Sequence, residues 1–100
     1  MIVIKVQYQV KPEYVATNSE NIERVMSDLR ALKNDDIRYS AFLQEDGCTF
    51  MHFAMYPDEA TLKIVSDLPA FSRFQTELKA SGPVVPPQVE NYTLVASSHL

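Results

Sequence analysis

His52 is the side chain of this sequence best suited to proton transfer near neutral pH, because the imidazole pKa lies closest to that range. It stands in the middle of an apolar run between Thr49 and Tyr56. Such a histidine is either a base or hydrogen-bond donor in a pocket, or a core residue held by a carbonyl or a tyrosine. Both interpretations stay open at this point.

Two other polar side chains are placed to join His52. Asn18 falls in a helical stripe between Val15 and Ile22, where an apolar residue is expected, and a buried amide needs partners. The alternative is a boundary residue that caps the helix or meets water. Tyr39 lies diagonal to His52 on one sheet face and is either a pocket hydroxyl or a core aromatic with a wet tip. We predict that Asn18 and His52 line one cavity.

Two aromatic side chains are candidates for the wall of that cavity. Phe71 and Phe74 are spaced to share one face of a late helix, where they either contact a substrate or belong to the plain core. A metal site is not predicted, since His52 has no second ligand at suitable spacing and Cys48 lies roughly 13 Å along the strand. Glycine-rich phosphate loops, CxxC and HExxH are absent from the sequence, so we expect no cofactor.

A predicted hairpin fixes which of these side chains share a face. Asp46-Gly47 lies between two apolar runs, and a two-residue type I′ turn there needs positive φ at both positions. The expected pairs are Leu43 with Phe50, Ala41 with His52, and Tyr39 with Ala54.

The remaining elements follow from hydrophobic periodicity. Residues 2–10 alternate as a strand, and a helix begins near Pro12 and runs to Leu32, in preference to a capping-box start at Thr17. A short helix opens at 57–58, a second carries residues 71–78, and 89–95 read as the last strand after a stiff proline pair. This order predicts an α+β, ferredoxin-like βαββαβ sandwich with a four-stranded antiparallel sheet. We expect one domain over residues 1–100 with a flexible tail at 97–100.

The other face of the predicted hairpin is also apolar. It carries Phe42, Met51, Phe53 and Met55, a patch too large to leave in water. A second copy of the sheet is the economical cover, so we predict a homodimer, the alternative being a monomer with an apolar sheet face.

Composition excludes some partners. The formal net charge is −4 and no basic run occurs, which argues against nucleic acid. No apolar stretch could span a bilayer, and we expect neither a membrane partner nor a signal peptide. The single cysteine excludes an intramolecular disulfide, so a cytoplasmic location is expected.

Three local strings of the sequence are distinctive: Val10-Lys11-Pro12, Asp46-Gly47-x-Thr49-Phe50-x-His52 and Leu68-Pro69-x-Phe71-x-x-Phe74. Together they resemble the antibiotic biosynthesis monooxygenase (ABM) family of dimeric α/β barrels. The resemblance implies a homodimer whose sheets pack face to face, with a pocket between sheet and helices in each subunit. Some members of that family oxidise quinols or phenols with oxygen and no cofactor.

Three functions are therefore open. The first is a cofactor-independent monooxygenase of a phenol or quinol, in which His52 takes the phenol proton, Asn18 and Tyr39 orient the ring, and Phe71 and Phe74 exclude water. The second is a module that binds a small aromatic molecule without turning it over. The third is a structural or regulatory dimer.

Overall fold

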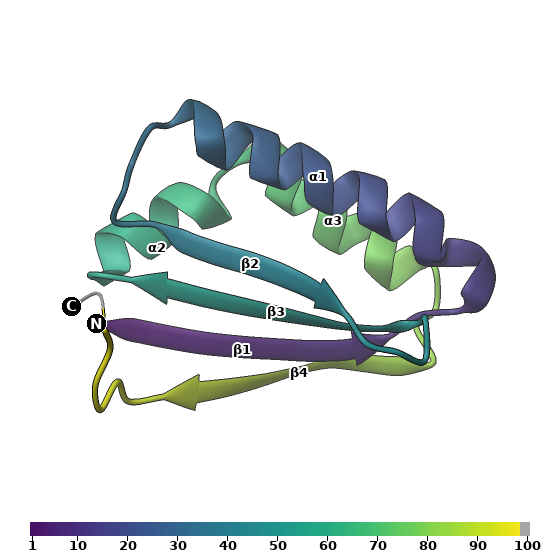
Figure 1. Cartoon of the computed structure of the whole chain (residues 1–100). Coiled ribbons are helices and arrows are strands. Elements are labelled where there is room, and N and C mark those ends of the chain that lie inside the picture. The colour runs from purple at the N-terminus through teal and green to yellow at the C-terminus, as the bar shows by residue number, and fades with distance from the viewer. Residues whose placement is uncertain (99–100) are drawn as a thin grey trace.

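The computed structural model describes residues 1–98. It consists of a single antiparallel sheet with helices on one side. The strands lie in the order β2-β3-β1-β4 (Figure 1), which is the ferredoxin-like arrangement predicted from the sequence. The elements are β1 (Ile2–Gln9), the 3-10 turn η1 (Pro12–Tyr14), α1 (Val15–Ala31), β2 (Arg38–Leu43), β3 (Thr49–Tyr56), α2 (Glu59–Ser66), α3 (Pro69–Ala80) and β4 (Val85–Tyr92). The predicted flexible tail at 97–100 lies partly outside the described residues.

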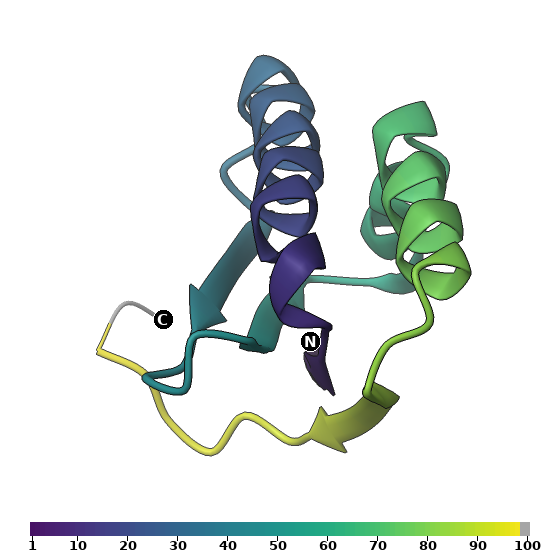
Figure 2. The ribbon, with the colours of Figure 1, turned by 90° about the vertical axis from the view of Figure 1, so that its right-hand side faces the viewer.

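The two longest helices, α1 and α3, lie side by side above the sheet and leave its other face open (Figure 2). The main core fills the space between these layers, and a smaller cluster lies under α2. The main core consists of Tyr8, Val10, Val25, Phe50, Phe74 and Leu78. No helix within residues 1–98 is both long enough and apolar enough to cross a bilayer.

The helix boundaries follow their local signals. Pro12 opens η1 and α1 continues from Val15, so the early start is confirmed and the alternative start at Thr17 is wrong. Asp58 caps α2, because its carboxylate accepts hydrogen bonds from the backbone N–H and the hydroxyl of Thr61, both at 2.8 Å. Pro69 then starts α3, which confirms the predicted break between the two late helices.

The hairpin has the predicted register and a different turn. Tyr39, Ala41 and Leu43 pair with Ala54, His52 and Phe50. Only the glycine of the turn has positive φ in this part of the chain, at 77°, so the predicted type I′ geometry is wrong. The Asp46 carboxylate instead accepts bonds from the backbone N–H groups of Cys48 and Thr49, at 3.0 and 2.9 Å, which closes a wider loop with the same pairing.

The last strand begins four residues before its predicted start, at Val85 rather than at residue 89. The pairing with β1 shifts between Gln7 and Gln9, so Pro86-Pro87 occupies a bulge instead of a connection before the strand. Prolines are tolerated there because β4 is an edge strand, where a missing N–H breaks no inner ladder.

Candidate functional site

His52 is held between two tyrosine hydroxyls inside the molecule. Its Nε2 lies 2.7 Å from the hydroxyl of Tyr8 on β1, and its Nδ1 lies 2.7 Å from the hydroxyl of Tyr39 on β2. Both neighbours are placed by the sheet, because β1 and β2 flank β3 and the three side chains point to the helix-covered face. Only 4% of the surface of His52 is exposed.

Asn18 extends this chain from the helix layer. Its side-chain amide Nδ2 donates to the Tyr8 hydroxyl at 2.9 Å, and the residue is fully buried. The four groups therefore form one hydrogen-bonded series, Asn18–Tyr8–His52–Tyr39, which we call the polar chain. The Asn18 carbonyl oxygen Oδ1 has no hydrogen-bond partner within residues 1–98.

The polar chain implies one arrangement of protons. Because the Asn18 amide donates to the Tyr8 oxygen, the Tyr8 hydroxyl hydrogen is free to bond His52 Nε2. The neutral imidazole then carries its proton on Nδ1 and donates it to the Tyr39 oxygen. In this arrangement the Tyr39 hydroxyl hydrogen remains available to a ligand oxygen.

Burial keeps the titratable members of the polar chain uncharged. Loss of solvation lowers the pKa of His52 to about 4, since the buried imidazolium is disfavoured. The same cause raises the pKa of Tyr8 and of Tyr39 well above the ordinary value of 10.0. At neutral pH the chain is a series of neutral donors and acceptors.

The polar chain ends at a cavity of about 540 Å³ between the sheet and α3. A neighbouring hollow of about 230 Å³ shares Val6, Tyr39, His52, Phe71 and Gln75 with it. The cavity wall is mainly apolar and is formed by Val6, Tyr8, Tyr39, His52, Phe71, Phe74, Gln75, Leu78, Lys79, Pro83, Pro86 and Pro87.

Aromatic rings make one side of this wall. The centroid of His52 lies 5.3 Å from that of Phe74, and the rings of Tyr39 and Phe71 meet edge to face at 6.5 Å. Phe71 and Phe74 are themselves 6.2 Å apart. A flat aromatic molecule is the class of ligand that such rings complement best.

Four of the five predicted site residues line the cavity: His52, Tyr39, Phe71 and Phe74. The prediction that Asn18 lines it too is wrong, because the side chain lies behind Tyr8 and reaches the cavity only through that hydroxyl.

Tyr8 is the residue that the sequence reasoning missed. It lies on the helix-covered face of β1, pairs with Phe50 and is therefore diagonal to His52. The alternation of residues 2–10 places Tyr8 on the apolar face of its strand. Only the pairing of β1 with β3 shows that this face brings the Tyr8 hydroxyl next to His52.

The geometry changes the role expected of His52. Both ring nitrogens are engaged by hydroxyl groups, so the imidazole lines the cavity without a free nitrogen, and the Tyr39 hydroxyl is the group beside it that can bond a ligand. Among residues 1–98 no group of three or more His, Cys, Asp or Glu side chains is arranged to hold a metal ion.

Solved structures of the same architecture are numerous. A structure described as an antibiotic biosynthesis monooxygenase superposes with a TM-score of 0.80 at 19% identity, over 96% of this chain and 100% of that one. The chain has the ABM fold.

Two further structures with the ABM fold come from named organisms. Rv0793 from Mycobacterium tuberculosis matches with a TM-score of 0.80 at 14% identity, over 97% of each chain. A mutant of SnoaB, a cofactor-independent oxygenase from Streptomyces nogalater, matches with a TM-score of 0.70 at 14% identity, over 97% of this chain and 95% of that one. No family model and no curated protein matches this sequence.

Proposed function

We propose that this protein binds a small phenolic or quinol-type molecule in the cavity beside the polar chain and oxidises it with molecular oxygen, without a cofactor. The observation that carries the proposal is the Asn18–Tyr8–His52–Tyr39 series, which ends at an apolar cavity walled by aromatic rings. SnoaB, which shares the fold, is a cofactor-independent oxygenase. That likeness supports the same class of reaction here.

Tyr39 is the group that would contact the ligand oxygen. Its hydroxyl hydrogen is free in the proton arrangement described above, so it can stabilise a phenolate or carbonyl oxygen. Proton transfer would use the other neutral tautomer, in which Nε2 carries the proton and donates it to the Tyr8 oxygen while Nδ1 accepts from the Tyr39 hydroxyl. The substrate proton would then pass to the Tyr39 oxygen as the Tyr39 proton moves to Nδ1, which leaves a phenolate and an imidazolium. His52 would thus act through Tyr39 rather than by direct contact.

The oxidation balances without an external reductant. A phenol with a hydrogen on the ring carbon opposite its hydroxyl reacts with one O₂ to give a quinone and one water. One oxygen atom enters the ring and the other leaves as water, and all electrons come from the substrate. The protein supplies orientation, exclusion of water by Phe71 and Phe74, and proton movement.

A binding module without turnover is the second candidate. The observation that favours it is the state of His52, whose two nitrogens are occupied and whose pKa lies at about 4, which makes it a weak base. Binding and oxidation can be separated, because binding needs the cavity while oxidation also needs the proton path.

One experiment decides between the candidates. Oxygen uptake is followed with a panel of phenols and quinols, and binding of the same compounds is followed by tyrosine fluorescence, which is usable because the chain has no tryptophan. Oxidation predicts uptake that His52→Ala abolishes. Binding with no uptake for any compound would support the module, and no binding at all would overturn both candidates.

We also propose that the open face of the sheet is covered by a second copy of the chain. Phe42 there is 53% exposed, and Phe53 stacks on Tyr92 of β4 with ring centroids 6.3 Å apart. The apolar patch of the hairpin thus reaches Tyr92 on the opposite edge strand, beside an ion pair of Lys5 and Glu90 at 3.7 Å on the same face. A face-to-face dimer would bury this patch.

A further inference from the structure

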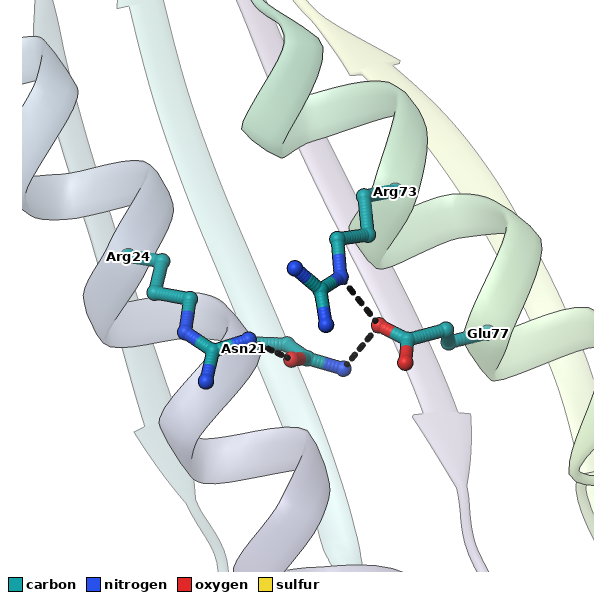
Figure 3. Close-up of polar contacts among 4 residues, drawn as sticks. All are labelled: Asn21, Arg24, Arg73 and Glu77. Carbon is teal, nitrogen blue, oxygen red and sulfur yellow. Dashed lines mark hydrogen bonds and ion pairs between the residues drawn. The ribbon is translucent and has the colours of Figure 1, made fainter.

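Two arginines from different helices meet on the outer surface of the molecule, away from the cavity. Arg24 of α1 and Arg73 of α3 both reach over the seam between the helices (Figure 3). Beneath them lies Asn21, only 4% exposed. A hollow of about 250 Å³ opens at this point and is lined by Asn21, Arg24, Pro69, Ala70 and Arg73.

Each of the two exposed guanidinium groups makes one hydrogen bond and leaves most of its donors unused. Arg24 donates one bond, from Nη1 to the side-chain oxygen Oδ1 of Asn21 at 3.5 Å. Arg73 donates one bond, from Nε to the Glu77 carboxylate at 3.2 Å. A guanidinium carries several N–H donors in a planar fork, so the remaining N–H groups on both residues are free to bind a ligand.

The cluster of Asn21, Arg24, Arg73 and Glu77 (Figure 3) carries two positive charges and one negative charge, although the whole chain is negative. Its single carboxylate, that of Glu77, is engaged by Arg73 and by the Asn21 amide at 3.0 Å. Within residues 1–98 Arg24 forms no ion pair, whereas Arg30 on the same helix pairs with Glu23. Arg24 is therefore a positioned cation without a carboxylate.

We propose that this hollow is a binding site for an oxyanion, a carboxylate or phosphate group of a small ligand, held by Arg24 and Arg73 together. Planar guanidinium forks match the paired oxygens of such groups. The buried Asn21 amide contacts Arg24 directly and Arg73 through Glu77, so one buried group links both guanidinium groups at the seam. The ligand would join α1 to α3.

The test is a titration of the folded protein, observed by NMR of the backbone amides and the arginine Nε–H groups. Inorganic phosphate and acetate are the two probes, added separately in low-chloride buffer, and the tighter one identifies the preferred oxyanion. We expect saturable shifts at the Ala70 amide and the Arg73 Nε–H. Arg24→Gln and Arg73→Gln should each raise Kd about tenfold, which is the loss of roughly one charge-assisted hydrogen bond.

Two further variants distinguish a specific oxyanion site from a general effect of positive charge and from a purely structural role of the cluster. Arg30→Gln removes the same charge from the same helix and should leave Kd unchanged. Glu77→Gln keeps an acceptor oxygen for Arg73 and Asn21 but removes the negative charge beside the site, so it should lower Kd. Equal weakening by Arg30→Gln and Arg24→Gln, a Kd that does not fall in Glu77→Gln, or shifts that never saturate would each overturn the proposal.

Discussion

The hydroxyl of Tyr8 lies 2.7 Å from Nε2 of His52, although the two residues are diagonal and not paired across their strands. The same hydroxyl accepts the amide of Asn18 at 2.9 Å. Tyr8 is therefore the link between the helix layer and the imidazole, and its loss would interrupt the polar chain on both sides.

Tyr8→Phe should destabilise the fold by about 2 kcal/mol or more. The substitution keeps the ring and leaves two buried groups without partners, His52 Nε2 and the Asn18 amide, each at a cost of roughly 1–3 kcal/mol. Urea unfolding measures the change. Tyr56→Phe is the matched control, because Tyr56 is 4% exposed but lies outside the polar chain. Equal losses in both variants would mean that the polar chain adds no stability.

The stability of the protein should fall between pH 6.5 and pH 4 because of His52. Its folded-state pKa of about 4 lies below the ordinary 6.5, so the unfolded chain takes up the proton first as the pH falls. The contribution is fully present above pH 6.5 and amounts to about 3 kcal/mol at most. Urea unfolding at a series of pH values should show this slope in the wild type.

His52→Gln should remove that slope. The carboxylates of Asp46 and Asp58 also have lowered pKa values, because hydrogen bonds stabilise their charged forms. Their contributions begin to be lost only near pH 5, about one unit above the ordinary carboxyl value of 3.8, so they do not account for a change between pH 6.5 and about pH 5. A slope that persists in the variant would show that another group is responsible.

If the cavity is catalytic, turnover should rise with pH through about 4 and then stay level to pH 8. Only the neutral imidazole accepts a proton, and His52 is already neutral above that range. His52→Ala should lower the rate on the order of 10²–10⁴-fold, the usual contribution of a general base. Oxygen uptake across the pH range measures both effects.

Tyr39→Phe tests the route by which the substrate proton reaches His52. The variant removes the hydroxyl between cavity and imidazole, so we expect a loss of rate comparable to that of His52→Ala, with the ring contacts kept. Tyr92→Phe on the open face of the sheet is the control. Full activity in Tyr39→Phe would mean that the substrate reaches His52 directly.

The open face of the sheet should form a dimer interface. Phe53→Asp would place an unpaired charge in that interface and should convert a dimer to a monomer, as measured by sedimentation. Ile64→Asp is the control, because Ile64 is 44% exposed on α2, on the helix side. A wild type that sediments as a monomer at micromolar concentration would contradict the assignment of this face.

Sequence alone was sufficient for the order of the strands and for four residues of the cavity wall. The hairpin register follows from two alternating runs, and that register determines the face of His52 and Tyr39. Helical spacing similarly predicted Phe71 and Phe74 on the cavity side of α3. These are local patterns with one dominant period.

The connections between distant segments were not predictable in the same way. Tyr8 meets His52 only because β1 pairs with β3, a contact separated by 44 positions in the chain. Asn18 is buried, as expected. It is kept from the cavity by the side chain of Tyr8, whose hydroxyl it contacts, and the helical pattern of α1 carries no information about that side chain. The start of β4 was misplaced because Pro86-Pro87 was read as a connection, while an edge bulge accommodates both prolines.

β4 gives the cavity a wall that can separate from the rest of the fold. In a single copy of the chain all eight of its residues are exposed, it is hydrogen-bonded to β1 alone, and Pro86 and Pro87 nevertheless line the cavity. Local unfolding is easiest where few buried contacts oppose it. Fraying of this single strand would open the cavity from the side while the Tyr8–His52–Tyr39 series stays closed. Ligand exchange and rapid amide hydrogen exchange should therefore share one opening event, in β4.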